Sequence, residues 1–63
     1  MPIISVQMYE GRTTDQKRRL VERITDAVVT SLDVKPEEVR IFLQEIAKHN
    51  VATAGVLVSD KKG

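Results

Sequence analysis

The chain has 63 residues, no cysteine, a single histidine and a formal net charge of +1. This length allows one domain at most, and the composition excludes disulfides, thiolate zinc sites and a histidine cluster for a structural metal. So small a net charge gives no reason to expect a nucleic acid or membrane partner. The sequence shows no secretory signal and no run of roughly 20 apolar residues, so we expect a cytoplasmic protein.

The first predicted element is a strand over residues 2–8. Apolar Ile4, Val6 and Met8 alternate there with the remaining side chains, and a period of two is typical of a strand that has one apolar face. The pattern breaks at residues 10–13, which predict a turn between this strand and the next element.

A helix is predicted to begin near Thr13, because Thr13 and Gln16 have the spacing of a capping box. The apolar residues that follow recur at spacings of three, four and seven, so they share one helical face. They are Leu20, Val21, Ile24, Ala27, Val28 and Leu32. Residues 33–36 end the helix, since the residue before a proline resists helical geometry. Residues 36–38 predict one short helical turn.

A second strand is predicted over residues 39–46, where side chains alternate again. A strand, a helix and a strand with short links make a βαβ unit, whose strands should be parallel and whose crossover should be right-handed. Residues 51–58 are apolar, contain Gly55 and predict a small hairpin against a neighbouring subunit. The sequence therefore predicts one α+β domain over residues 1–63, with one helix covering the parallel sheet and a short C-terminal hairpin.

Such a fold is incomplete as a single copy. Two strands with one covering helix leave open sheet edges and an uncovered face. Small domains without disulfides or metals commonly gain their stability by association. Strands from a second copy are the simplest way to complete the layer, so we expect the protein to work as an oligomer.

Few residues offer chemistry, since no serine–histidine pair, phosphate-binding glycine loop or cysteine nucleophile is present. Pro2 remains, because an initiator methionine before proline is normally removed, which would expose a secondary amine. An α-amino group titrates at about pH 8, and desolvation or nearby guanidinium groups favour its neutral, proton-accepting form. The alternative is that Pro2 only begins an edge strand, where no N–H donor is needed.

Arg12 and Arg40 are the next candidates. Arg12 lies between the first strand and the helix, and Arg40 lies early on the second strand. Paired guanidinium groups suit a substrate with two negative charges. Each arginine alone is more often a surface cation of little energetic weight, so position by itself leaves both interpretations open.

Several motifs together resemble the 4-oxalocrotonate tautomerase family: Pro2-Ile3, Glu10-Gly11-Arg12-Thr13, Asp15-Gln16-Lys17, Val39-Arg40 and Glu45-Ile46-Ala47-Lys48. The match runs without gaps over nearly the whole chain. The resemblance implies a βαβ unit with a C-terminal hairpin, a dimer whose four-stranded sheet is covered by two helices, and commonly a homohexamer of three dimers. It implies no metal and no organic cofactor.

The resemblance also implies a keto–enol tautomerase, an isomerase of the kind found in aromatic hydrocarbon catabolism. Pro2 would be the general base for a 2-oxo or 2-hydroxy unsaturated acid, for example in converting 2-hydroxymuconate to 2-oxo-3-hexenedioate. Arg12 would bind the remote carboxylate and Arg40 the 2-oxygen end, from adjoining subunits. Val51 stands where the family has a phenylalanine wall, so a smaller wall and an altered substrate preference are expected.

Two alternatives remain open. The first is a hydratase or dehalogenase of unsaturated acids. Relatives of that kind carry a further arginine where this chain has Tyr9 and a glutamate where it has Thr53, so the acid that activates water is missing. The second is a non-catalytic assembly subunit of a tautomerase-like oligomer, which the substitution at Val51 keeps open.

Overall fold

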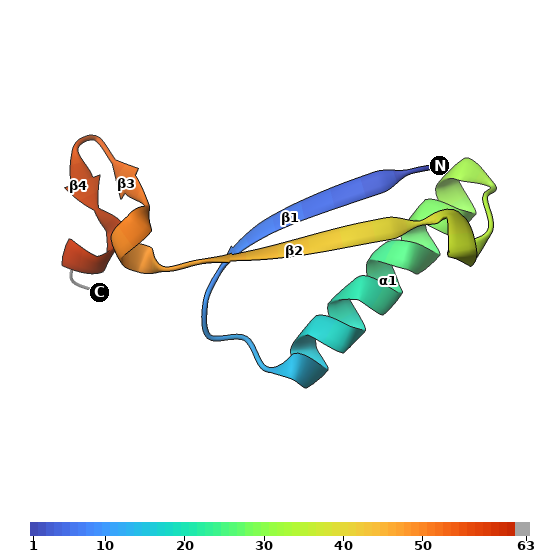
Figure 1. Ribbon diagram of the computed structural model, residues 1–63, viewed down its shortest axis with the longest axis horizontal. Coiled ribbons are helices and arrows are strands. Elements are labelled where there is room, and N and C mark those ends of the chain that lie inside the picture. Colours follow the sequence, from blue (N-terminus) through green and yellow to red (C-terminus); the bar gives the residue numbers. More distant parts are fainter. Residues whose placement is uncertain (62–63) are drawn as a thin grey trace.

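The computed structural model describes residues 1–61, and the last two positions of the predicted domain lie outside this range. The helix and strands follow in the order β1 Ile3–Tyr9, α1 Thr14–Leu32, β2 Arg40–Ile46, β3 Ala52–Thr53 and β4 Val56–Leu57. Short 3-10 turns lie at Pro36–Glu38, Lys48–Asn50 and Val58–Asp60. The predicted α+β fold, with one helix and a C-terminal hairpin, is confirmed (Figure 1).

β1 and β2 lie side by side and parallel, with Ile3 paired to Arg40 in the register. Two further backbone hydrogen bonds extend the pairing. The Arg40 N–H donates to the Pro2 carbonyl at 3.1 Å, and the Glu10 N–H donates to the Ile46 carbonyl at 3.2 Å. The predicted parallel βαβ unit is therefore confirmed, and the pairing fixes the backbone from Pro2 to Glu10 against β2.

α1 lies across one face of this sheet (Figure 1). Its first turn has the predicted capping box: the Gln16 N–H donates to the Thr13 hydroxyl at 3.1 Å, and the Thr13 N–H donates to the Gln16 side-chain oxygen at 2.9 Å. The helix ends at Leu32, where Asp33 takes a left-handed conformation with φ 56°. Within residues 1–61, no helix has an apolar stretch that could cross a bilayer.

The two faces of the sheet differ in burial. An ion pair between Lys17 on α1 and Glu45 on β2 identifies the face that the helix covers. Five of the half-buried apolar side chains of the strands lie on this same face, and a sixth, Ile46, lies on the other: the five are Ile4, Val6, Met8, Ile41 and Leu43. On the opposite face Ile3 and Phe42 are 64% and 54% exposed. The helix-free face thus carries large apolar side chains that are uncovered in one copy.

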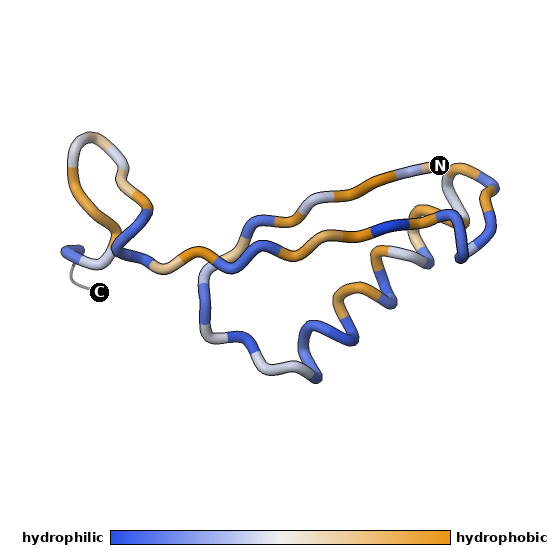
Figure 2. Tube along the Cα trace, in the orientation of Figure 1, coloured by the Kyte–Doolittle hydropathy of each residue, from blue (hydrophilic) through white to orange (hydrophobic). Residues whose placement is uncertain are grey.

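A single copy has no closed core, since no side chain of residues 1–61 is fully buried. Its accessible surface of 5224 Å² exceeds the roughly 4100 Å² expected of a folded monomer of 7.1 kDa. The radius of gyration is 15.1 Å, against about 11 Å for a compact domain of this length. Figure 2 shows apolar segments on the strands, the helix and the hairpin alike. One copy therefore exposes apolar surface that needs a cover.

The hairpin of β3 and β4 extends beyond the end of β2, away from α1 (Figure 1). Its two-residue turn consists of Ala54 and Gly55, with φ values of 54° and 80°. Positive φ at both positions matches a type I′ turn, which suits the twist of a hairpin. At its base, the Val58 N–H donates to the Val51 carbonyl at 2.8 Å, which fixes the backbone of Val51.

Candidate functional site

Pro2 and Arg40 lie together at one end of the sheet, where the hydrogen bond between their backbones joins the start of β1 to the start of β2. Pro2 is half-buried. It precedes the first residue of β1, a position at which proline is tolerated because the sheet needs no N–H donor there. Met1 is 86% exposed, so the peptide bond between Met1 and Pro2 is accessible to cleavage. Strand pairing thus brings two of the predicted site residues together.

Arg12 and Val51 lie at the opposite end of the sheet. Arg12 belongs to the segment after β1, and Val51 follows the turn after β2. Two neighbouring pockets open here. One, of about 410 Å³, is lined by Met8, Tyr9, Glu10, Gly11, Arg12 and Lys48. The other, of about 310 Å³, is lined by Gln7, Met8, Tyr9, Ile46 and Val51.

The length of β1 separates these two groups of residues. β1 has seven residues, which span about 23 Å at roughly 3.3 Å per residue. This is much longer than an arginine side chain, so Pro2 and Arg12 of one copy cannot contact the same small molecule. A site that contains all the predicted residues needs the Pro2 end of one copy beside the hairpin end of another.

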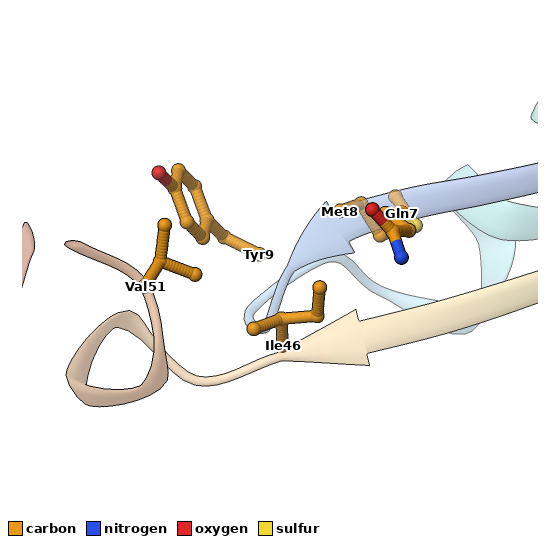
Figure 3. A pocket seen from close by; sticks show the side chains of 5 residues that line it. All are labelled: Gln7, Met8, Tyr9, Ile46 and Val51. Carbon is orange, nitrogen blue, oxygen red and sulfur yellow. The ribbon is translucent and has the colours of Figure 1, made fainter. Parts of the chain in front are cut away.

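Figure 3 shows the apolar pocket at the hairpin end. The Tyr9 ring lies next to Val51, with Ile46 below them and Met8 farther along β1. The Lys48 ammonium lies 6.0 Å from the centroid of the Tyr9 ring, a cation–π distance. Sequence reasoning gave neither Tyr9 nor Lys48 a role. The parallel register sets the end of β1 beside the end of β2 and so indicates that the two segments are neighbours, but the contact itself depends on the turn after β2.

The charged side chains of the larger pocket are Arg12, Lys48 and Glu10. None of the three forms an ion pair with a residue in the described part of the chain, where both ion pairs involve α1 instead. Two cations and one carboxylate leave a positive balance that suits an anionic ligand. Residues 1–61 contain no cluster of histidine and carboxylate side chains suited to a metal ion.

Comparison with known proteins adds three findings. Residues 2–61 match the family described as tautomerase enzyme. The chain is 43% identical over 60 residues to 2-hydroxymuconate tautomerase of Bacillus subtilis strain 168, covering 95% of this chain and 97% of the relative. The crystal structure of YwhB, a homologue of 4-oxalocrotonate tautomerase, matches with a TM-score of 0.92 and 41% identity, over 97% of this chain and 100% of the other.

A third relative is similar in fold at lower identity. It is a heterohexamer 4-oxalocrotonate tautomerase from Chloroflexus aurantiacus J-10-fl, with a TM-score of 0.90 and 29% identity. The match covers 98% of this chain and 100% of that one. The whole βαβ unit and its hairpin, rather than one motif, therefore carry the similarity.

Proposed function

On the basis that this chain belongs to the tautomerase family and is an isomerase of the 4-oxalocrotonate tautomerase type, we propose that Pro2 is its general base. Loss of Met1 would free the Pro2 nitrogen for this role. The observation that carries the proposal is the backbone pairing of Pro2 with Arg40 at an open end of the sheet. A basic nitrogen and a guanidinium group are thereby held on adjacent strands. The substrate is a 2-hydroxydienoate or an enolpyruvate-like acid such as 2-hydroxymuconate.

One base performs both proton transfers in this reaction. The neutral Pro2 nitrogen takes the proton of the 2-hydroxyl group, which leaves a dienolate and a pyrrolidinium ion. The pyrrolidinium then gives the proton to carbon 5 of 2-hydroxymuconate, while the bond from carbon 2 to oxygen becomes a carbonyl. The remaining double bond lies between carbons 3 and 4. The product is an isomer of the substrate, and the amine returns to its neutral form.

The two arginines divide the substrate between them. Arg40 holds the 2-oxygen and the adjacent carboxylate, and its positive charge stabilises the dienolate as it forms. The same charge favours the neutral amine over the ammonium form, which keeps Pro2 available as a base. Arg12, at the other end of a neighbouring copy, binds the remote carboxylate through charge-assisted hydrogen bonds.

Self-association completes the site in this proposal. The large accessible surface, the absence of buried side chains in residues 1–61 and the exposed Ile3 and Phe42 all favour a second copy against the helix-free face. Pro2 and Arg12 also need different copies to act on one molecule, because β1 separates them. We propose dimers that assemble further into a hexamer, which is consistent with the hexameric state of the Chloroflexus relative.

Ultraviolet-monitored ketonisation of 2-hydroxymuconate and phenylenolpyruvate tests the proposal, with Met1 removal first verified by intact mass. We expect acceleration that falls by about 100-fold or more when Met1 is retained, since the Pro2 nitrogen is then an amide and a positioned base contributes at least that much. Pro2→Ala tests whether a secondary amine is required, because alanine leaves a primary one. Native mass spectrometry serves as the control and should show the same assembly for each protein. Equal turnover by protein that retains Met1 and protein that has lost it would show that the amine is not the base.

A further inference from the structure

Tyr9 and Lys48 form a pair at the hairpin end that the proton transfers do not use. The ammonium group of Lys48 lies over the Tyr9 ring at 6.0 Å from its centroid. Both side chains line the same pocket as Arg12. Tyr9 also lines the neighbouring apolar pocket, where its ring lies next to Val51 (Figure 3). The Tyr9 ring therefore separates a cationic pocket from an apolar one.

The backbone fixes this pair from both strands. The hydrogen bond from Glu10 to Ile46 holds the end of β1 against the end of β2, directly after Tyr9. The 3-10 turn Lys48–Asn50 then begins two residues beyond β2, and the Asn50 N–H donates to the Ala47 carbonyl at 2.9 Å. Lys48 and Tyr9 are thus placed by secondary structure on both sides, which suits a role in positioning a ligand.

Charge and shape at this end complement the far end of an elongated acid. Arg12 and Lys48 supply two positive charges against the single carboxylate of Glu10, and within residues 1–61 neither cation has a carboxylate partner. A valine offers little apolar surface beside such a ligand. The Tyr9 ring, 43% exposed, presents a larger flat surface at the same place.

We propose that Tyr9 and Lys48 determine which substrates the site accepts. The Tyr9 ring is the apolar wall against which the conjugated chain of the substrate stacks, and the Lys48 ammonium binds the terminal carboxylate together with Arg12. The pair thereby favours a conjugated diacid over an acid whose far end is uncharged. This inference rests on the proposed function for the location of the site, but its test does not depend on turnover.

Two inert acids of equal length test the role of Lys48. The diacid (E,E)-muconate and the monoacid sorbate differ only at the far end, and calorimetric titration of the assembled, Met1-free protein measures their affinities. We expect muconate to bind more tightly than sorbate. Lys48→Gln should weaken muconate about fivefold, as for a partly exposed ion pair, and leave sorbate within about twofold. Lys48→Arg should restore most of the loss.

Arg23→Gln is the matched control, because it removes one exposed positive charge from α1, away from both pockets at the hairpin end. Arg23→Gln should change neither affinity. An equal loss of muconate affinity in Arg23→Gln and Lys48→Gln would mean that overall charge determines the effect, and would overturn the assignment.

For Tyr9, replacement by leucine should lower the affinity for both acids about threefold, because stacking area is lost. Replacement by phenylalanine should lower neither affinity.

Turnover separates the failure of this inference from the failure of the proposed function. If the protein ketonises 2-hydroxymuconate in a Pro2-dependent manner but Lys48→Gln leaves both KM and muconate affinity unchanged, only the Lys48 assignment is overturned. If muconate binds in a Lys48-dependent manner without any turnover, the assignment holds and the proposed reaction is wrong. Failure of the unaltered protein to prefer muconate over sorbate would overturn the inference directly.

Discussion

Arg40 and Arg12 carry the same charge but occupy opposite ends of the sheet, and their different surroundings predict different kinetic effects. Arg40→Ala removes the charge beside Pro2, so we expect kcat to fall about 100-fold for diacid and monoacid alike, as for a lost oxyanion donor. Arg12→Ala removes the proposed partner of the remote carboxylate, so we expect a raised KM for 2-hydroxymuconate and little change for phenylenolpyruvate. Steady-state kinetics on both substrates checks this, and identical profiles for the two variants would contradict the division of roles.

The sequence was sufficient to place some of these residues and not others. The neighbourhood of Pro2 and Arg40 follows from a parallel βαβ unit, because the first residues of both predicted strands must lie at one end. The contact between Tyr9 and Lys48 depends on how the chain turns immediately after β2. Spacing in the sequence carries no signal for that turn, so sequence reasoning left Tyr9 without a role.

The helix and strands lie where the sequence patterns predicted them, and the differences at their boundaries have physical causes. The predicted first strand over residues 2–8 is instead Ile3–Tyr9. Pro2 has no N–H and joins the ladder only through its carbonyl, so the strand begins one residue later. The capping box fixed the helix start in advance, because it depends only on residues three apart in the sequence.

The turn between β3 and β4 contains a residue poorly suited to its conformation. Ala54 has φ 54°, and a left-handed conformation costs a residue with a Cβ about 1–2 kcal/mol. Asparagine tolerates this region and is favoured before glycine in type I′ turns. We therefore expect Ala54→Asn to raise the free energy of unfolding by about 1 kcal/mol per chain. Thermal unfolding at one fixed protein concentration measures this.

Ala52→Asn is the matched control for the turn, since Ala52 lies in β3 and has no positive φ. It should not stabilise the protein, because asparagine is depleted in strands. A gain of equal size at both positions would mean that polarity of the hairpin surface, rather than turn geometry, determines the effect.

If Pro2 and Arg12 act on one substrate as proposed, the distance between them makes the assembled molecule, rather than the chain, the unit of activity. If each site draws Pro2 from one copy and Arg12 from another, mixed assemblies of Pro2→Ala and Arg12→Ala chains contain some sites in which both residues are intact. We expect each variant alone to turn over 2-hydroxymuconate poorly, and a mixture that is unfolded and refolded together to recover a substantial part of the lost activity.

The control is the same two variants mixed after separate refolding, which at a substrate concentration below KM should show no more activity than the average of the separate variants as long as subunits do not exchange. Native mass spectrometry verifies that mixed assemblies are present. Activity of the co-refolded mixture equal to the average of the separate variants would show that one copy supplies both residues, contrary to the separation along β1.

The absence of a buried side chain within residues 1–61 of one copy has a kinetic consequence. A chain that acquires its interior only by meeting another copy cannot complete folding in a first-order step, so we expect the rate of refolding to rise with protein concentration. Stopped-flow refolding over a hundredfold range of concentration checks this, and a constant rate would show that one copy folds to completion alone. If folding is coupled to association in this way, the rate of synthesis in a cell helps to determine activity. At low chain concentration two copies meet less often, so the buried interior and the proposed site form more slowly.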